Sequence, residues 1–179
     1  GAVTGALLTA DEGSVANIGE DVTGGVTNVA VSVSNANVAG PIVGVQTIIG
    51  DVKDVTVTLS NTSVTGGNSV LGAQARRGSA DNVKVSVSNS TVTGNVMGGV
   101  SGGAADPVAI KSGLSATNNS VTISGTSTVR GTVTGGYAEY GNATSNTVTI
   151  SDTPSIGLAV DGADNVGGVV GGAVGTKGN

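Results

Sequence analysis

One eight-residue segment recurs five times along this chain, and this recurrence limits the fold more than any other feature does. In each copy, aliphatic residues alternate mostly with Ser or Thr, so one face of an extended strand is apolar and the other is polar. The copies align without gaps. They lie at 27–34, 53–60, 81–88, 117–124 and 144–151, and the central valines that anchor them are Val31, Val57, Val85, Val121 and Val148.

Glycines recur in phase with this strand and divide each repeat further. One lies six or seven residues past the last Ser of each copy, at Gly40, Gly66, Gly94, Gly131 and Gly157, and a second follows at Gly44, Gly72, Gly98 and Gly135. Gly permits corners with positive φ and close packing of backbones. Asn and Asp precede the strand and favour turns through side-chain hydrogen bonds to the backbone, at Asn28, Asp54, Asn82, Asn119 and Asn146. This pattern therefore predicts that each repeat contains three short strands separated by turns.

Stacked coils explain this pattern, because an aliphatic strand face that one repeat cannot bury alone becomes part of a continuous interior. A helical fold fails, since Gly and β-branched residues are poor helix formers. An antiparallel β-sandwich explains the alternation but not why the motif recurs in phase. We therefore expect an all-β fold, a parallel β-helix (β-solenoid) of about six coils of 26–28 residues, with three short strands per coil.

The repeat also predicts the organisation of the chain, which we expect to be one domain over residues 1–179. Residues 1–26 form a partial coil, because 1–5 match 131–135. Five repeats follow over 27–157, with a loop insertion at about 102–116 where the spacing lengthens. Residues 158–179 form a Gly/Val-rich C-terminal coil. The chain opens without Met and starts and stops inside a repeat, so we expect a processed or excised piece.

Composition excludes several kinds of chemistry. The chain has no His and no Cys, so it has no imidazole base, thiol nucleophile, Cys/His zinc site or disulfide. Carboxylate pairs at 11–12, 20–21 and 161/164 are scattered, and the glycine-rich calcium nonapeptide is missing. We therefore predict no enzyme activity, no catalytic residue, no metal and no cofactor. The net charge of −5 and the absence of long basic or apolar runs predict neither nucleic-acid binding nor a membrane span.

Three segments carry a resemblance to a known family. Residues 118–125, 129–137 and 140–151 look like the repeats of bacterial autotransporter passenger regions and related surface β-helices. The resemblance covers residues 27 to about 157 and is strongest over 117–151. It implies a right-handed parallel β-helix, export to the cell surface, and adhesive or structural work. The translocating β-barrel of such proteins has no counterpart in this sequence, so this chain alone does not make a whole autotransporter.

Two groups of residues are candidates for contact with other molecules. The first lies in loops and includes several of the few large side chains of the sequence, although a solvated surface is the simpler explanation: Arg76, Arg77, Asp106, Lys111, Tyr137, Glu139 and Tyr140. The second lies near the chain ends, which are flat, nearly uncharged and uncapped, and is suited to end-to-end stacking: Val3, Leu7, Val166, Val169, Val170 and Val174.

The expected function is an extracellular structural or adhesive β-solenoid module, secreted or on a bacterial cell surface. Such a module is suited to stacking head to tail into a surface filament and to binding a ligand on host or neighbouring cells. The alternative is a passenger fragment excised from a larger autotransporter adhesin. Two further alternatives are an ice-binding protein and a polysaccharide-active β-helix enzyme. Ice binding relies on flat ladders of Thr side chains, and Lys84 would interrupt such a ladder here.

Overall fold

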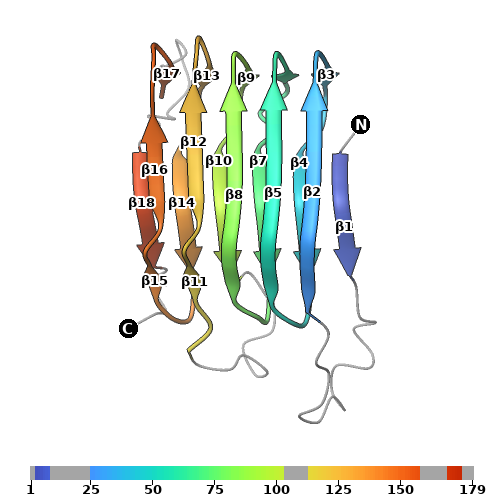
Figure 1. Cartoon of the computed structure of the whole chain (residues 1–179), viewed down its shortest axis with the longest axis vertical. Coiled ribbons are helices and arrows are strands. Elements are labelled where there is room, and N and C mark those ends of the chain that lie inside the picture. The colour runs from blue at the N-terminus through green and yellow to red at the C-terminus, as the bar shows by residue number, and fades with distance from the viewer. Residues whose placement is uncertain (1–2, 9–24, 103–112, 158–168, 175–179) are drawn as a thin grey trace.

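A computed structural model describes residues 3–8, 25–102, 113–157 and 169–174, and within these ranges every regular element is a β-strand. The strands form three parallel sheets, which we call A, B and C (Figure 1). Sheet A contains, in spatial order, β1 (Val3–Leu8), β4 (Ile42–Thr47), β7 (Val70–Ala75), β10 (Val96–Ser101), β14 (Val133–Ala138) and β18 (Val169–Val174).

Sheets B and C complete each turn of the chain. Sheet B contains β2 (Val26–Ser34), β5 (Val52–Ser60) and β8 (Ala80–Ser88), followed by two broken strands: β11 (Ala116–Thr117) with β12 (Ser120–Ser124), and β15 (Ala143–Thr144) with β16 (Thr147–Ile150). Sheet C contains β3 (Asn37–Val38), β6 (Ser63–Val64), β9 (Thr91–Val92), β13 (Thr128–Val129) and β17 (Ser155–Ile156). The chain passes from B to C to A and then begins the next turn.

The predicted β-solenoid is confirmed, and so is the register of the repeat. Each anchor valine pairs with the anchor of the next coil, from Val31 through Val57, Val85 and Val121 to Val148. The expected number of about six coils was too high. The groups β2–β4, β5–β7, β8–β10, β11–β14 and β15–β18 each supply strands to all three sheets, with residues 158–168 of the last group outside the described residues, and β1 adds a further strand to sheet A.

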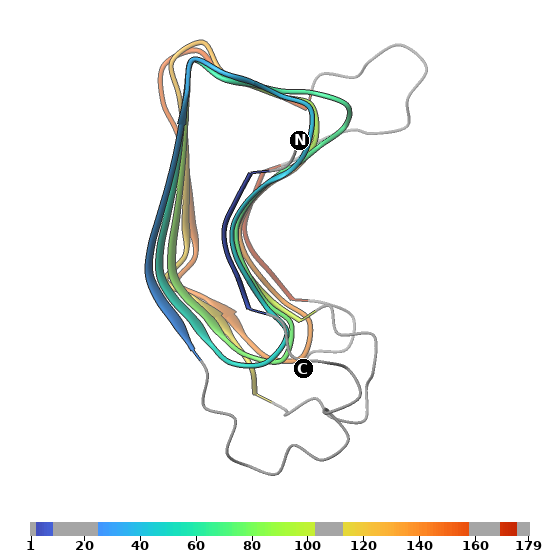
Figure 2. The same cartoon turned by 90° about the vertical axis from the view of Figure 1, so that its right-hand side faces the viewer.

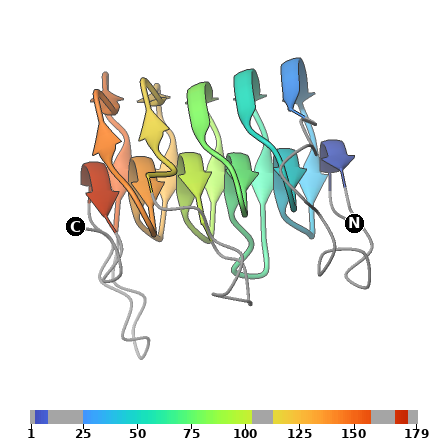
Figure 3. The ribbon, with the colours of Figure 1, turned by 90° about the horizontal axis from the view of Figure 1, so that it is seen from below.

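Sheet A bends toward sheet B, so the outer surface of sheet A is concave (Figure 2). Glycines that recur in sheet A, such as Gly44 and Gly72, face the valine side chains of sheet B. A Cβ atom on Gly72 would lie only 2.4 Å from Cγ1 of Val83 in sheet B, so only Gly lets the two backbones approach this closely. The coils then stack along the solenoid axis, as the view along the strands shows (Figure 3).

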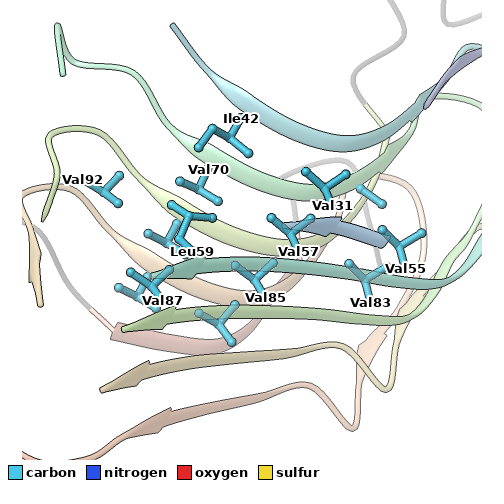
Figure 4. Close-up of a cluster of buried hydrophobic side chains, with 14 of the residues drawn as sticks. Val31, Ile42, Val55, Val57, Leu59, Val70, Val83, Val85, Val87 and Val92 are labelled. Carbon is cyan, nitrogen blue, oxygen red and sulfur yellow. The ribbon is translucent and has the colours of Figure 1, made fainter. Parts of the chain in front are cut away.

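The interior is a narrow column of aliphatic side chains (Figure 4). Val55, Val57 and Leu59 of β5 pair in register with Val83, Val85 and Val87 of β8, and each of these six is at most 2% exposed. Because neighbouring coils supply the same small side chains, each buried row continues from one coil to the next. This column explains why the chain does without large aromatic residues.

A corner near the start of the long strands of sheet B is formed by residues in the left-handed region, and here one prediction was partly wrong. Asn28, Asp54 and Asn82 have φ between 52° and 58°, as a turn role requires. In the next two coils the left-handed residues are Asn118 and Ser145, not Asn119 and Asn146. The latter two lie one position later, where the earlier coils carry an inward-facing Val.

Asn119 is completely buried, and its amide replaces backbone bonds of the sheet. Its Oδ1 accepts from the backbone N–H of Val83 at 2.9 Å, and its Nδ2 donates to the carbonyl of Ala80 at 3.1 Å. Asn146 repeats the arrangement one coil later, since its Oδ1 accepts from the backbone N–H of Asn119 at 3.0 Å. Because Asn119 and Asn146 take the place of the inward Val, the long strand of sheet B is divided in these two coils, into β11 with β12 and into β15 with β16.

Candidate functional site

The outer surface of sheet B carries rows of hydroxyl groups, and we call this surface the hydroxyl face. Strand alternation directs the residues between the buried aliphatic ones outward, and none of them is buried. Two complete rows run across five coils. One consists of Ser32, Thr58, Ser86, Thr122 and Thr149, and the other of Ser34, Ser60, Ser88, Ser124 and Ser151.

A third row on the hydroxyl face is less regular. Lys84 lies in register between Thr56 and Ser120, so it interrupts this row as the sequence indicated. Neighbouring strands place hydroxyls about 4.8 Å apart, and alternate residues of one strand about 6.8 Å apart. The two complete rows contain no charged side chain. These two rows therefore offer a regular, uncharged array of donors and acceptors to a flat ligand.

A polar network occupies the corner that precedes the hydroxyl face. Asn118 Nδ2 and Thr117 Oγ1 each donate to Asp81 Oδ1 at 2.9 Å, and Lys53 Nζ lies 3.8 Å from Asp81 Oδ2. The hydrogen bond from Asn118 is the main reason that the pKa of Asp81 is lowered, and the positive charge of Lys53 contributes less. The network ties three neighbouring coils together at one corner.

The concave outer surface of sheet A, which we call the concave face, is different in character. One row across it is largely apolar and consists of Val43, Leu71, Met97 and Thr134. The adjacent row consists of Gln46, Gln74, Val100 and Tyr137. Gln46 Nε2 donates to Gln74 Oε1 at 2.8 Å, and Gln74 Nε2 donates to the carbonyl of Gly102 at 3.2 Å, so the amides form a ladder along the axis.

Most of the loop residues that the sequence singled out lie along one edge of the concave face. Arg76 and Arg77 directly follow β7, and Glu139 and Tyr140 directly follow β14. Successive backbone bonds continue the ladder of sheet A past its strands, from Gly102 N to Ala75 O at 2.9 Å and from Glu139 N to Ser101 O at 2.9 Å. Asp106 and Lys111 lie outside the described residues.

The strands predicted to stack end to end lie at the two ends of sheet A. β1 contains Val3 and Leu7, and β18 contains Val169, Val170 and Val174, so these residues belong to the first and last strands of that sheet (Figure 1). Val166 lies outside the described residues. In sheet B, the last strand β16 carries Ile150, which is 43% exposed and is the one exposed large hydrophobic side chain of the described chain.

Sequence reasoning missed the glutamine ladder and the inward asparagines. Gln46 and Gln74 occupy the same place in consecutive repeats, so a register-by-register alignment of the third strand would have found them. The inward turn of Asn119 had no such signal, because Asn118 and Asn119 are the same residue type side by side. Only the position of the left-handed residue distinguishes their roles.

Comparisons of the chain with protein-family models, with curated proteins and with solved structures find no match. Among the described residues, no group of three or more Asp, Glu, His or Cys side chains is arranged to hold a metal ion. Nor do these ranges include a helix that is long and apolar enough to cross a membrane. The candidate site therefore rests on the two sheet surfaces alone, and the fold defines the class of protein as a parallel β-solenoid.

Proposed function

We propose that this β-solenoid is an extracellular adhesive and structural module, of the kind found in bacterial autotransporter passengers. It works by holding a ligand rather than by turnover, on a secreted protein or a bacterial cell surface. The hydroxyl face is the observation that supports this proposal. Its two complete rows form a rigid, uncharged, in-register array that suits many weak hydrogen bonds to the surface of a host or neighbouring cell.

A retention assay tests the adhesive role. Surfaces coated with the purified chain should retain cultured epithelial cells or members of a panel of immobilised glycans, without release of sugar products. Thr58→Lys and Thr122→Lys each place a charge within a complete row and should reduce retention several-fold. Asn37→Lys adds the same charge on the exposed part of β3 in sheet C and should leave retention unchanged. Equal loss in all three variants, or no retention at all, would contradict adhesion through this face.

Stacking of copies into filaments is a second candidate function, and the edge at β16 favours it. Within the described chain, β2 and β16 each pair with only one long strand of sheet B, and Ile150 is exposed on β16. An unpaired strand edge of this kind readily accepts another strand. Light scattering should show mass rising with concentration, and Ile150→Lys should suppress the rise. A concentration-independent monomer would dismiss stacking without affecting the adhesive proposal.

A further inference from the structure

The turn that follows β7 contains donors without acceptors. Nε of Arg76 and both Nε and Nη1 of Arg77 are buried, and none of them makes a hydrogen bond. The turn itself is held on both sides, because Arg76 N donates to Thr47 O at 3.0 Å and Gly78 O accepts from Ser101 Oγ at 2.8 Å. The two guanidinium groups are therefore attached to a fixed backbone.

Buried guanidinium N–H groups are expensive to leave unpaired, because Arg stays charged and cannot remove the donors by losing a proton. Most carboxylates of the described chain are engaged elsewhere. Asp51 accepts from Ser79 N at 2.7 Å, Asp54 from Asn82 Nδ2 at 2.6 Å, and Asp152 from Gly125 N at 3.0 Å. Asp81 is occupied by the corner network, and the only described ion pair joins it to Lys53. Glu139, which follows β14 on the same edge, is engaged as well. None of the described carboxylates is bonded to these three nitrogen atoms, so the position suits an oxyanion supplied from outside these residues.

The place of this turn in the fold indicates what carries the oxyanion. Arg76 lies two residues past Gln74, at the rim of the concave face. That face provides amide groups from Gln46 and Gln74 and the ring of Tyr137, all in one row that runs across the coils. Amides bind hydroxyl groups, and an aromatic ring packs against a sugar ring. The row repeats about every 4.8 Å along the axis, which suits an extended chain lying along it.

We propose that the concave face binds a linear acidic polysaccharide, whose carboxylate or sulfate group is held by Arg76 and Arg77. Planar guanidinium groups bind such oxyanions with two parallel hydrogen bonds. This site goes beyond the adhesion proposed above, because it uses sheet A and not the hydroxyl face of sheet B. The chain carries a net charge of −5, so attraction at this edge is local and does not arise from an overall positive field.

Calorimetry with a sulfated heparin oligosaccharide, a carboxylated polygalacturonate oligosaccharide and neutral dextran tests the proposal. One or both acidic ligands should bind and dextran should not. Arg77→Gln should weaken binding about tenfold or more, as expected for the loss of charge-assisted hydrogen bonds. Arg130→Gln removes the same charge from an exposed position at the end of β13 and should change affinity less than twofold. Arg77→Lys keeps the charge, loses the planar group, and should also bind more weakly.

NMR signals of the arginine Nε–H groups report on the site directly, and melting curves exclude variants that fail to fold. The acidic oligosaccharide should shift the Arg76 and Arg77 signals and leave that of Arg130 in place. Three results would overturn the proposal: no binding of either acidic ligand, an equal loss with Arg130→Gln, or a response to inorganic sulfate as strong as that to the oligosaccharides, which would indicate an adventitious ion only. The Thr58→Lys variant should bind these ligands normally, which separates this site from the hydroxyl face.

Discussion

At the scale of single residues, the side chain of one buried asparagine makes hydrogen bonds that backbone groups make elsewhere in the solenoid. Asn119 is completely buried, yet its amide is satisfied on three sides, by Val83 N, Ala80 O and Asn146 Oδ1. Space for it comes from the opposite sheet. A Cβ atom on Gly99 would lie 2.5 Å from Asn119 Oδ1, and one on Gly136 would lie 2.4 Å from Asn146 Oδ1. Each inward Asn therefore requires a Gly across the interior.

Replacement of Asn119 tests this role. Asn119→Ala leaves the N–H of Val83 and the carbonyl of Ala80 buried without partners, so we expect unfolding in denaturant to show a loss of about 2–4 kcal/mol. Asn37→Ala removes an exposed amide from β3 and should change stability by less than about 0.5 kcal/mol. Similar losses in the two variants would show that the inward amide contributes nothing special.

The contact between Gly99 and Asn119 can be tested separately. Gly99→Ala should destabilise the chain by about 1–3 kcal/mol, because the added methyl group overlaps the amide. In the double variant with Asn119→Ala the overlap disappears. Its total loss should therefore be smaller than the sum of the single losses. Simple additivity would mean that the two residues do not share this space.

Asp81 makes stability depend on pH. The hydrogen bond from Asn118 lowers the pKa of Asp81 below that of an unfolded aspartate, so the ionised carboxylate stabilises the fold at neutral pH. This stabilisation is lost as the pH falls below about 3.9 and through the lowered pKa of the folded state. The melting temperature of the natural chain should thus fall more between pH 6 and pH 2 than that of Asp81→Asn. Lys53→Met should keep most of this dependence, because Lys53 is a minor cause. Parallel curves for the natural chain and Asp81→Asn would contradict this assignment.

At the scale of elements, left-handed residues form two corners in each coil, one within the long strand of sheet B and one after it. The corner after sheet B consists of Asn35, Asn61, Asn89, Gly125 and Asp152, all with positive φ. Asn61 Nδ2 donates to Asn35 Oδ1 at 3.4 Å, and Asn89 Oδ1 accepts from Thr126 N at 3.2 Å. Next to this corner, a buried hydroxyl row continues the pattern, since Thr62 N donates to Ser90 Oγ and Ser90 N to Ser127 Oγ.

The left-handed geometry predicts an unusual order of substitutions at Asn61, whose φ is 49°. Asn61→Gly should be nearly neutral, because Gly adopts this conformation freely. Asn61→Ala should lower the free energy of unfolding by about 1–2 kcal/mol, because a Cβ atom strains the left-handed backbone. At Asn37, which is exposed and has no positive φ, the order should reverse, with Ala tolerated better than Gly. Equal effects of the two changes at Asn61 would show that backbone conformation does not limit this corner.

The whole molecule is a stack in which each coil contacts only its neighbours, so its stability is distributed along one axis. β5 and β8 each pair on both sides, whereas the terminal strands β2 and β16 have one long partner within the described part of sheet B. Hydrogen exchange followed by mass spectrometry should therefore find slow exchange in β5 and β8 and faster exchange in β2 and β16. Uniform protection across all four strands would indicate a single cooperative unit. The same experiment on concentrated samples should slow exchange in β16 if copies stack there.

The sequence by itself determined the period, the register and the inward set of valines, because the alternation of apolar and polar residues repeats in phase in every coil. It also placed Arg76 and Glu139 at corresponding points of their repeats. Only the tertiary structure decided that sheet A bends inward, that Asn119 faces the interior while Asn118 forms the corner, and that the donors of Arg77 remain unpaired. The physical reason is the same in each case. These features depend on the space and the hydrogen-bond partners that other coils and the opposite sheet provide, and a repeat read alone contains neither.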